Sequence, residues 1–98
     1  MELGFFAWNL ASGMSASKAV LSDPARLRDF WHWDMAMHLN QQAERIGYEY
    51  QVPYGRWRGY GGPTRWNDDS LDFLGAAACL APVTSRMAIF STAHVTYK

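Results

Sequence analysis

The sequence predicts an α/β fold in which two helices alternate with three parallel strands. Apolar or alternating segments at residues 3–8, 48–53 and 87–95 are typical of strands, and segments with helix signals occupy residues 22–47 and 69–82. The strand starts recur about every 40 residues, which is enough for one strand and its crossover helix. This order predicts parallel strands joined by right-handed crossovers.

The three predicted strands differ in their side-chain pattern. Residues 3–8 (LGFFAW) form a short apolar run, which is typical of a strand buried on both faces. Residues 48–53 (YEYQVP) alternate aromatic or branched side chains with polar ones, and Pro53 ends them. Residues 87–95 (MAIFSTAHV) are apolar at first and turn polar at Ser91.

The first helical segment follows a long Gly/Ser-rich loop at residues 9–22. Asp23 is a candidate N-cap with Pro24 at the first helical position, and Gly47 is expected to stop the helix. The segment is long for one helix, so a break is expected near Phe30. One helical face is expected to carry Trp33, Ala36, Asn40, Ala43 and Ile46.

The second helical segment, residues 69–82, is rich in alanine, which permits close approach to a sheet. Asp69 or Asp68 is its candidate N-cap, and Pro82 marks its exit. The single cysteine, Cys79, lies within it and excludes an internal disulfide. We expect Cys79 to be an inert thiol in the core, as suits a reducing compartment.

Composition and charge indicate a small globular domain and make several other classes of protein less favoured. The 98 residues, 49% of them hydrophobic, suffice for one small globular domain. A formal net charge of zero argues against a nucleic-acid partner, since such domains usually carry a basic excess. Glu2 stands where a signal peptide needs a basic residue, and no segment is long and apolar enough to span a membrane, so we expect a soluble cytoplasmic protein.

The predicted sheet is incompletely covered. Two helices cannot cover both faces of three aromatic-rich strands, and a parallel sheet with one bare face is rare. The sequence is therefore expected to be the N-terminal part of a longer protein.

Polar residues collect at the carboxyl ends of the predicted strands, where ligands bind in parallel α/β folds. These ends are Trp8 and Asn9, then residues 54–56, then residues 91–94. Because parallel strands end at the same edge, we expect these groups to share one rim. His94 is a candidate general acid or base there, with a structural histidine as the alternative.

The segment VPYGRWRGYGG, residues 52–62, leaves several interpretations open. Arg56 and Arg58 are candidates for holding an anion, and the alternative is a surface arginine stacked on Trp57 or Trp66. Its glycines permit close approach of a flat ligand or simply form turns. A single-stranded RNA segment is a further alternative, disfavoured by the neutral charge. No dinucleotide or phosphate-loop motif and no metal-ligating cluster is present.

The motifs AERIGY, GRWRGYGG and LAPVTSRMAIFST resemble the luciferase-like flavin-dependent monooxygenases, and are most similar to the branch of alkanesulfonate, dimethyl-sulfone and pyrimidine monooxygenases. The resemblance implies that residues 1–98 are the N-terminal part of a (β/α)₈ barrel, supplying its strands one to three and two helices. It also implies oxygenation of a small organic substrate by reduced FMN and O₂ through a peroxyflavin. A separate NAD(P)H-dependent flavin reductase would be the partner, and the full-length enzyme would be a homo-oligomer.

The resemblance also assigns residues position by position. Gly55 and Arg56 match a pair that touches FMN, and Ser91 and Thr92 match the end of strand three, where a cis peptide bond is often found in the family. The residues implied to line the flavin or substrate pocket are Trp8, Asn9, Tyr54, Trp57 and His94.

Other functions stay open beside this one. A related barrel that uses the deazaflavin F420 is one alternative, and a stand-alone binding module is another. The catalytic acid or base and the phosphate-binding groups are expected downstream of this sequence, so the 98 residues alone are expected to be inactive.

Overall fold

A computed structural model describes residues 1–6, 9, 22–23, 31–62, 65 and 67–93. The predictions made for Trp8, Pro24, Phe30, Trp66 and His94 lie outside the described residues. The same holds for most of the loop predicted at residues 9–22.

The described sheet has three parallel strands in the order β1-β2-β3, as predicted. They are β1 (Gly4–Phe6), β2 (Tyr50–Val52) and β3 (Ala88–Ile89). Phe5 pairs with Gln51, and Gln51 pairs with Ile89. The strands are shorter than predicted, although Glu49 and Phe90, just outside them, still make backbone hydrogen bonds to the neighbouring strands.

Helix α2 (Trp33–Arg45) connects β1 to β2, and Gly47 ends it as predicted, with a positive φ of 104°. Its N-cap is His32. Ala36, Asn40 and Ala43 are buried as expected. The prediction for Ile46 is wrong: it follows the last helical residue and is 76% exposed.

Helix α3 (Phe73–Leu80) connects β2 to β3 and passes into the 3₁₀ helix η3 (Ala81–Val83), which contains Pro82. The predicted cap was wrong. Asp72 is the N-cap, and its carboxylate accepts a hydrogen bond of 2.7 Å from the Gly75 N–H. Asp68 and Asp69 contact Arg65 in the preceding loop instead.

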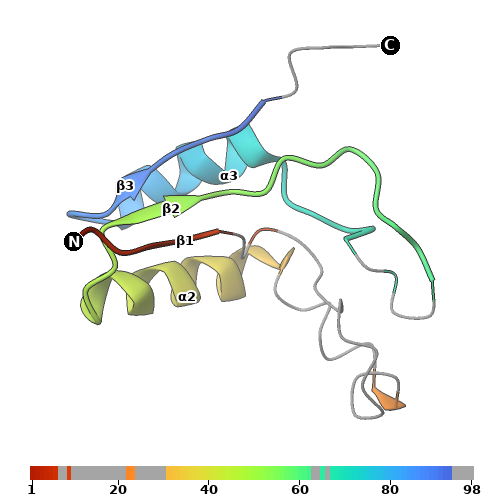
Figure 1. Ribbon diagram of the computed structural model, residues 1–98, viewed down its shortest axis with the longest axis horizontal. Coiled ribbons are helices and arrows are strands. Elements are labelled where there is room, and N and C mark those ends of the chain that lie inside the picture. The colour runs from red at the N-terminus through yellow and green to blue at the C-terminus, as the bar shows by residue number, and fades with distance from the viewer. Residues whose placement is uncertain (7–8, 10–21, 24–30, 63–64, 66, 94–98) are drawn as a thin grey trace.

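Both helices lie on one side of the sheet. The Gln41 side chain of α2 donates a hydrogen bond of 3.1 Å to the Val83 carbonyl, which directly follows α3. Gln51, at the centre of β2, is fully buried. Figure 1 shows the strands running side by side, with α2 next to β1 and α3 next to β3.

The opposite face of the sheet is largely uncovered by the described residues. Phe6 and Phe90 are 56% and 52% exposed. The expectation that the first strand is buried on both faces is therefore wrong for β1. This observation agrees with the predicted imbalance between two helices and three aromatic-rich strands.

The prediction that Cys79 is a core thiol is also wrong, since Cys79 is exposed on α3. The buried side of α3 is formed instead by Phe73, Ala76 and Leu80.

Within the described ranges, no helix combines the length and the apolar character that crossing a bilayer requires.

Candidate functional site

The carboxyl ends of β2 and β3 meet closely, as the sequence predicted for a shared rim. Gly55 follows β2, and a side chain there would place its Cβ 2.5 Å from the Thr92 Oγ1 after β3. The Thr92 hydroxyl donates to the Pro53 carbonyl at 3.1 Å, so it ties the two strand ends together. A side chain at position 55 would force the Thr92 side chain to move, so glycine permits this contact.

Ser91 anchors the same strand end to helix α3. Its hydroxyl donates to the Phe73 carbonyl at 3.2 Å, in the first turn of α3. The described residues contain no cis peptide bond, so the one implied near Ser91 and Thr92 is not found.

Asn9 joins the rim from β1, and the described structure buries it almost completely, with 1% of its surface exposed. Its amide accepts from the Tyr54 N–H at 2.7 Å and donates to the carbonyls of Tyr54 at 3.0 Å and Leu71 at 3.3 Å. The side chain therefore fastens the end of β2 to the segment that enters α3. Its implied role in lining a pocket stays a prediction.

Arg56 is the charged group of this rim, and two tyrosines hold it. Its Nη2 donates to the Tyr54 hydroxyl at 3.0 Å and to the Tyr60 hydroxyl at 2.7 Å. Its guanidinium carbon also lies 4.1 Å from the centre of the Tyr60 ring and 5.3 Å from that of Tyr54. The hydrogen bond to Tyr54, followed by that to Tyr60, raises the pKa of Arg56 further above its ordinary value. The result is a permanent cation in a defined position.

The Arg56 guanidinium lies against the rings of Tyr54 and Tyr60. The alternative of stacking on Trp66 lies outside the described residues. Trp57 itself is 66% exposed, and its ring meets the Phe73 ring edge-on at 5.2 Å. Beside it lies a hollow of about 230 Å³ lined by Arg56, Trp57, Ser70, Asp72 and Phe73.

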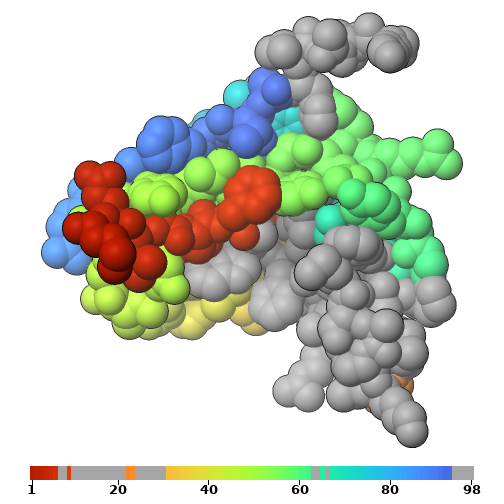
Figure 2. All heavy atoms as spheres, in the orientation of Figure 1, coloured from red at the N-terminus to blue at the C-terminus, as the bar shows by residue number. Residues whose placement is uncertain are grey.

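A second hollow, of about 390 Å³, lies within the loop that follows β2. This loop leaves the body of the molecule at the carboxyl ends of the strands and is widely exposed (Figure 2). A hollow of about 420 Å³ at the other end of the strands, beside Glu44 and Arg86, is remote from the rim. We place the candidate site at the rim because the fixed cation and the strand-end contacts are there.

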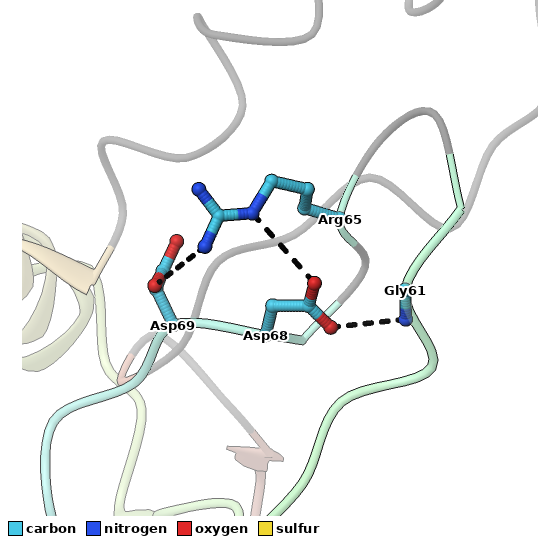
Figure 3. Close-up of polar contacts among 4 residues, drawn as sticks. All are labelled: Gly61, Arg65, Asp68 and Asp69. Atoms are coloured by element: carbon cyan, nitrogen blue, oxygen red, sulfur yellow. Dashed lines mark hydrogen bonds and ion pairs between the residues drawn. The ribbon is translucent and has the colours of Figure 1, made fainter.

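Two residues of this region were not predicted from the sequence. Tyr60 completes the arginine clamp, and Asp68 holds the loop that carries Tyr60 through a hydrogen bond of 2.9 Å from the Gly61 N–H (Figure 3). The alternation of arginine, glycine and tyrosine in residues 56–62 signals a special loop. It does not reveal which tyrosine folds back onto which arginine.

Among the described residues, no group of three His, Cys, Asp or Glu side chains is arranged to hold a metal ion.

The fold and the rim together define a parallel α/β unit with its polar groups at the strand ends, the arrangement that α/β enzymes use for ligands. The chain is 38% identical over 93 residues to pyrimidine monooxygenase RutA of Caulobacter sp. (strain K31), an alignment that covers 95% of this chain and 25% of that protein. It is 38% identical over 61 residues to pyrimidine monooxygenase RutA of Acinetobacter baylyi, covering 62% of this chain and 16% of that protein.

A further relative is pyrimidine monooxygenase RutA of Caulobacter vibrioides (strain NA1000 / CB15N), which is 32% identical over 60 residues, covering 61% of this chain and 17% of that protein. The chain thus spans a quarter or less of the length of the curated relatives it matches. No protein-family model and no solved structure matches the chain significantly. An oxidoreductase activity, the flavin, the substrate and the role of each rim residue therefore stay predictions for this chain.

Proposed function

We propose that this chain is part of a flavin-dependent monooxygenase that uses reduced FMN and O₂ to oxygenate a small organic substrate. The observation that carries the proposal is the Arg56 guanidinium, held by two tyrosine hydroxyls at the end of β2 beside the Gly55–Thr92 contact. The similarity to pyrimidine monooxygenases favours a pyrimidine-like ring amide over a sulfonate or a sulfone as the substrate.

The residues at the rim fit a flavin. Gly55 lets the end of β2 lie directly against Thr92 after β3, so the two strand ends form one compact rim beside the Arg56 cation, where the flavin would bind. Arg56 offers a fixed positive charge to an electron-rich oxygen of the cofactor. When bound, the reduced flavin supplies the electrons that activate O₂.

The side chains of this chain would position the flavin and exclude water. Arg56 would fix the flavin, and its clamp keeps the guanidinium from turning to solvent. The exposed Trp57 ring and the Tyr54 ring provide apolar surface beside it, which limits access of water to a reactive centre.

We further propose that the described sheet is a segment of a larger luciferase-like (β/α)₈ barrel. The support is the face that bears Phe6 and Phe90, which the described residues leave exposed, and the quarter of the relative's length that the chain spans. A cytoplasmic location, a homo-oligomeric state and an NAD(P)H-dependent flavin reductase as partner belong to the same proposal.

The test is a titration of the complete gene product with reduced FMN and, separately, with reduced F420 under anaerobic conditions. Arg56→Ala is expected to weaken binding of reduced FMN about tenfold, the effect of losing one charged hydrogen bond. Arg58→Ala, which removes an exposed arginine two residues away, is the matched control and is expected to change the affinity less than twofold.

Tighter binding of F420 than of FMN would replace the proposed cofactor. Equal FMN affinity for Arg56→Ala and the unmodified protein would refute the assignment of the rim. A protein that bound neither flavin would favour the stand-alone binding module.

A further inference from the structure

We propose that Asp68 is a positioning residue for Arg56, acting through the loop that carries Tyr60. The inference rests on the proposed function, because Arg56 matters for binding only if the rim holds an anionic or electron-rich ligand. It concerns a residue outside the rim itself.

Asp68 contacts the loop at the residues directly before and after Tyr60. Its Oδ1 accepts a hydrogen bond of 2.9 Å from the Gly61 N–H, which belongs to the peptide group directly after Tyr60 (Figure 3). The same carboxylate oxygen lies 2.2 Å from the position that a Cβ on Gly59, the residue directly before Tyr60, would take. The carbonyl group of Asn67 lies 2.5 Å from that position. The loop can therefore close onto Asp68 only because residue 59 is glycine.

Arg65 supports Asp68 from the other side. Its Nε lies 3.7 Å from Asp68 Oδ2, and its Nη2 lies 3.2 Å from Asp69 Oδ1. Both ion pairs are partly exposed to solvent, with the Arg65 side chain 52% exposed, so they contribute little by themselves. The hydrogen bond to Gly61, rather than the ion pairs, is expected to carry the effect on the loop.

Tyr60 transmits this restraint to the cation. Its ring is 58% exposed, so burial alone does not hold it in place. Its hydroxyl nevertheless accepts the shorter of the two Arg56 hydrogen bonds, at 2.7 Å. If Asp68 releases the backbone around Tyr60, the hydroxyl leaves the guanidinium and Arg56 keeps only Tyr54. The chain of contacts therefore runs from Asp68 through the Gly59–Gly61 backbone and Tyr60 to Arg56.

The test is a double-mutant cycle in the complete gene product, with the affinity for reduced FMN as one readout. Asp68→Ala and Tyr60→Phe are each expected to weaken binding about five- to tenfold, and the double variant no further than either alone. Asp68→Asn keeps an oxygen for the Gly61 N–H and is expected to stay within about twofold of the unmodified protein. Arg65→Gln removes the ion pairs and is the matched control. Its affinity for reduced FMN is also expected to stay within about twofold of that of the unmodified protein.

The second readout needs no flavin. Nuclear magnetic resonance of ¹⁵N-arginine-labelled protein measures rotation about the Cζ–Nη bonds of Arg56, which hydrogen bonds to the tyrosines slow. Asp68→Ala and Tyr60→Phe should both accelerate this rotation, whereas Asp68→Asn should not.

The inference would be overturned if the double variant lost affinity by the product of the losses in Asp68→Ala and Tyr60→Phe. It would also be overturned if the rotation about the Arg56 Cζ–Nη bonds were unchanged in Asp68→Ala. A loss in Asp68→Asn as large as in Asp68→Ala would overturn it too. If Arg56→Ala left flavin affinity unchanged while the rotation followed the expected pattern, the proposed function would fail and the role of Asp68 would stand.

Discussion

Glu44 is expected to be the most sensitive polar side chain at the amino end of the sheet. It lies near the end of α2, and its carboxylate accepts hydrogen bonds from three consecutive backbone N–H groups just before β3. Arg86 donates at 2.5 Å, Met87 at 2.8 Å and Ser85 at 2.9 Å, all to Oε1. These bonds fix where β3 begins, and the ladder follows at once with the Ala88 N–H donating to the Glu49 carbonyl at 2.9 Å.

We expect Glu44→Ala to lower the free energy of unfolding by about 2–3 kcal/mol. A hydrogen bond to a charged group is worth about 1.5–3 kcal/mol, and three of them are lost together. The sum is not reached, because Glu44 is partly exposed and water replaces some of the lost bonds. Glu44→Gln keeps one acceptor oxygen without the charge and is expected to lose about 1 kcal/mol.

The effect should depend on pH. The N–H groups of Arg86 and Met87, in that order, hold the pKa of Glu44 below its ordinary value, against a smaller opposing effect of burial. A carboxyl group whose pKa is lowered by folding stabilises the folded state above its unfolded pKa, and this stabilisation is lost as the pH falls through the folded pKa. The difference between the unmodified protein and Glu44→Gln should therefore be full at pH 7 and shrink below about pH 4.

Urea unfolding followed by circular dichroism at a series of pH values is the assay, with the midpoint read at constant slope. Glu2→Gln, which changes an exposed carboxylate, is the matched control and should be neutral at every pH. A loss below about 0.5 kcal/mol for Glu44→Ala at pH 7, or a loss that does not depend on pH, would refute the reasoning.

Two further substitutions test the helix start and the strand ends by the same urea assay. Asp72→Ala removes the N-cap hydrogen bond to Gly75 and should lower the free energy of unfolding by about 1 kcal/mol. Asp72→Asn should lower it by only about a few tenths of a kcal/mol, and equal losses for both variants would contradict the capping role. Thr92→Val leaves the Pro53 carbonyl without its donor and should lower the free energy of unfolding by about 1 kcal/mol, whereas Thr92→Ser should keep most of the stability. An unchanged midpoint for Thr92→Val would show that this bond does not tie β2 to β3.

The order and pairing of the strands were predictable from the sequence, because they depend on local patterns and a general rule of handedness. The alternation in residues 48–53 and the apolar start of residues 87–95 located β2 and β3. Gly47 was predictable as a helix stop, because glycine, which has no Cβ, adopts the positive φ found after a helix without steric strain. The strand lengths were not predictable, because they depend on contacts after the strands such as those of the Ser91 and Thr92 hydroxyls with carbonyls of other segments.

Burial and capping were predicted less well, for a related reason. Cys79 and its alanine neighbours form an apolar run, which is typical of a buried helix, yet only one side of α3 is buried. Three aspartates close in sequence all fit the N-cap preference, and the choice of Asp72 depends on where Asp68 and Asp69 find other partners. Such choices are set by contacts between distant residues, which a local pattern does not contain.

The meeting of the strand ends at one rim was predictable from the sequence, whereas the contacts within the rim were not, and the function of its residues stays a prediction. Position at the end of β2 identified Gly55 and Arg56, whereas the contact of Tyr60 with Arg56 depends on a loop that folds back on itself. Glu44 is separated from its three donors by more than 40 positions in the chain, so no spacing rule predicts that clamp.

Polar side chains, more than apolar packing, fix both ends of this short sheet. The strands have two or three residues each, and half of the buried hydrophobic residues among those described are alanines. Glu44 therefore sets the start of β3 at one end, and Asn9 holds the end of β2 at the other. A shift of one residue in β3 would turn Thr92 away from Gly55, because neighbouring side chains point to opposite faces of a strand. The geometry of the rim consequently depends on a carboxylate at the far end of the same strands.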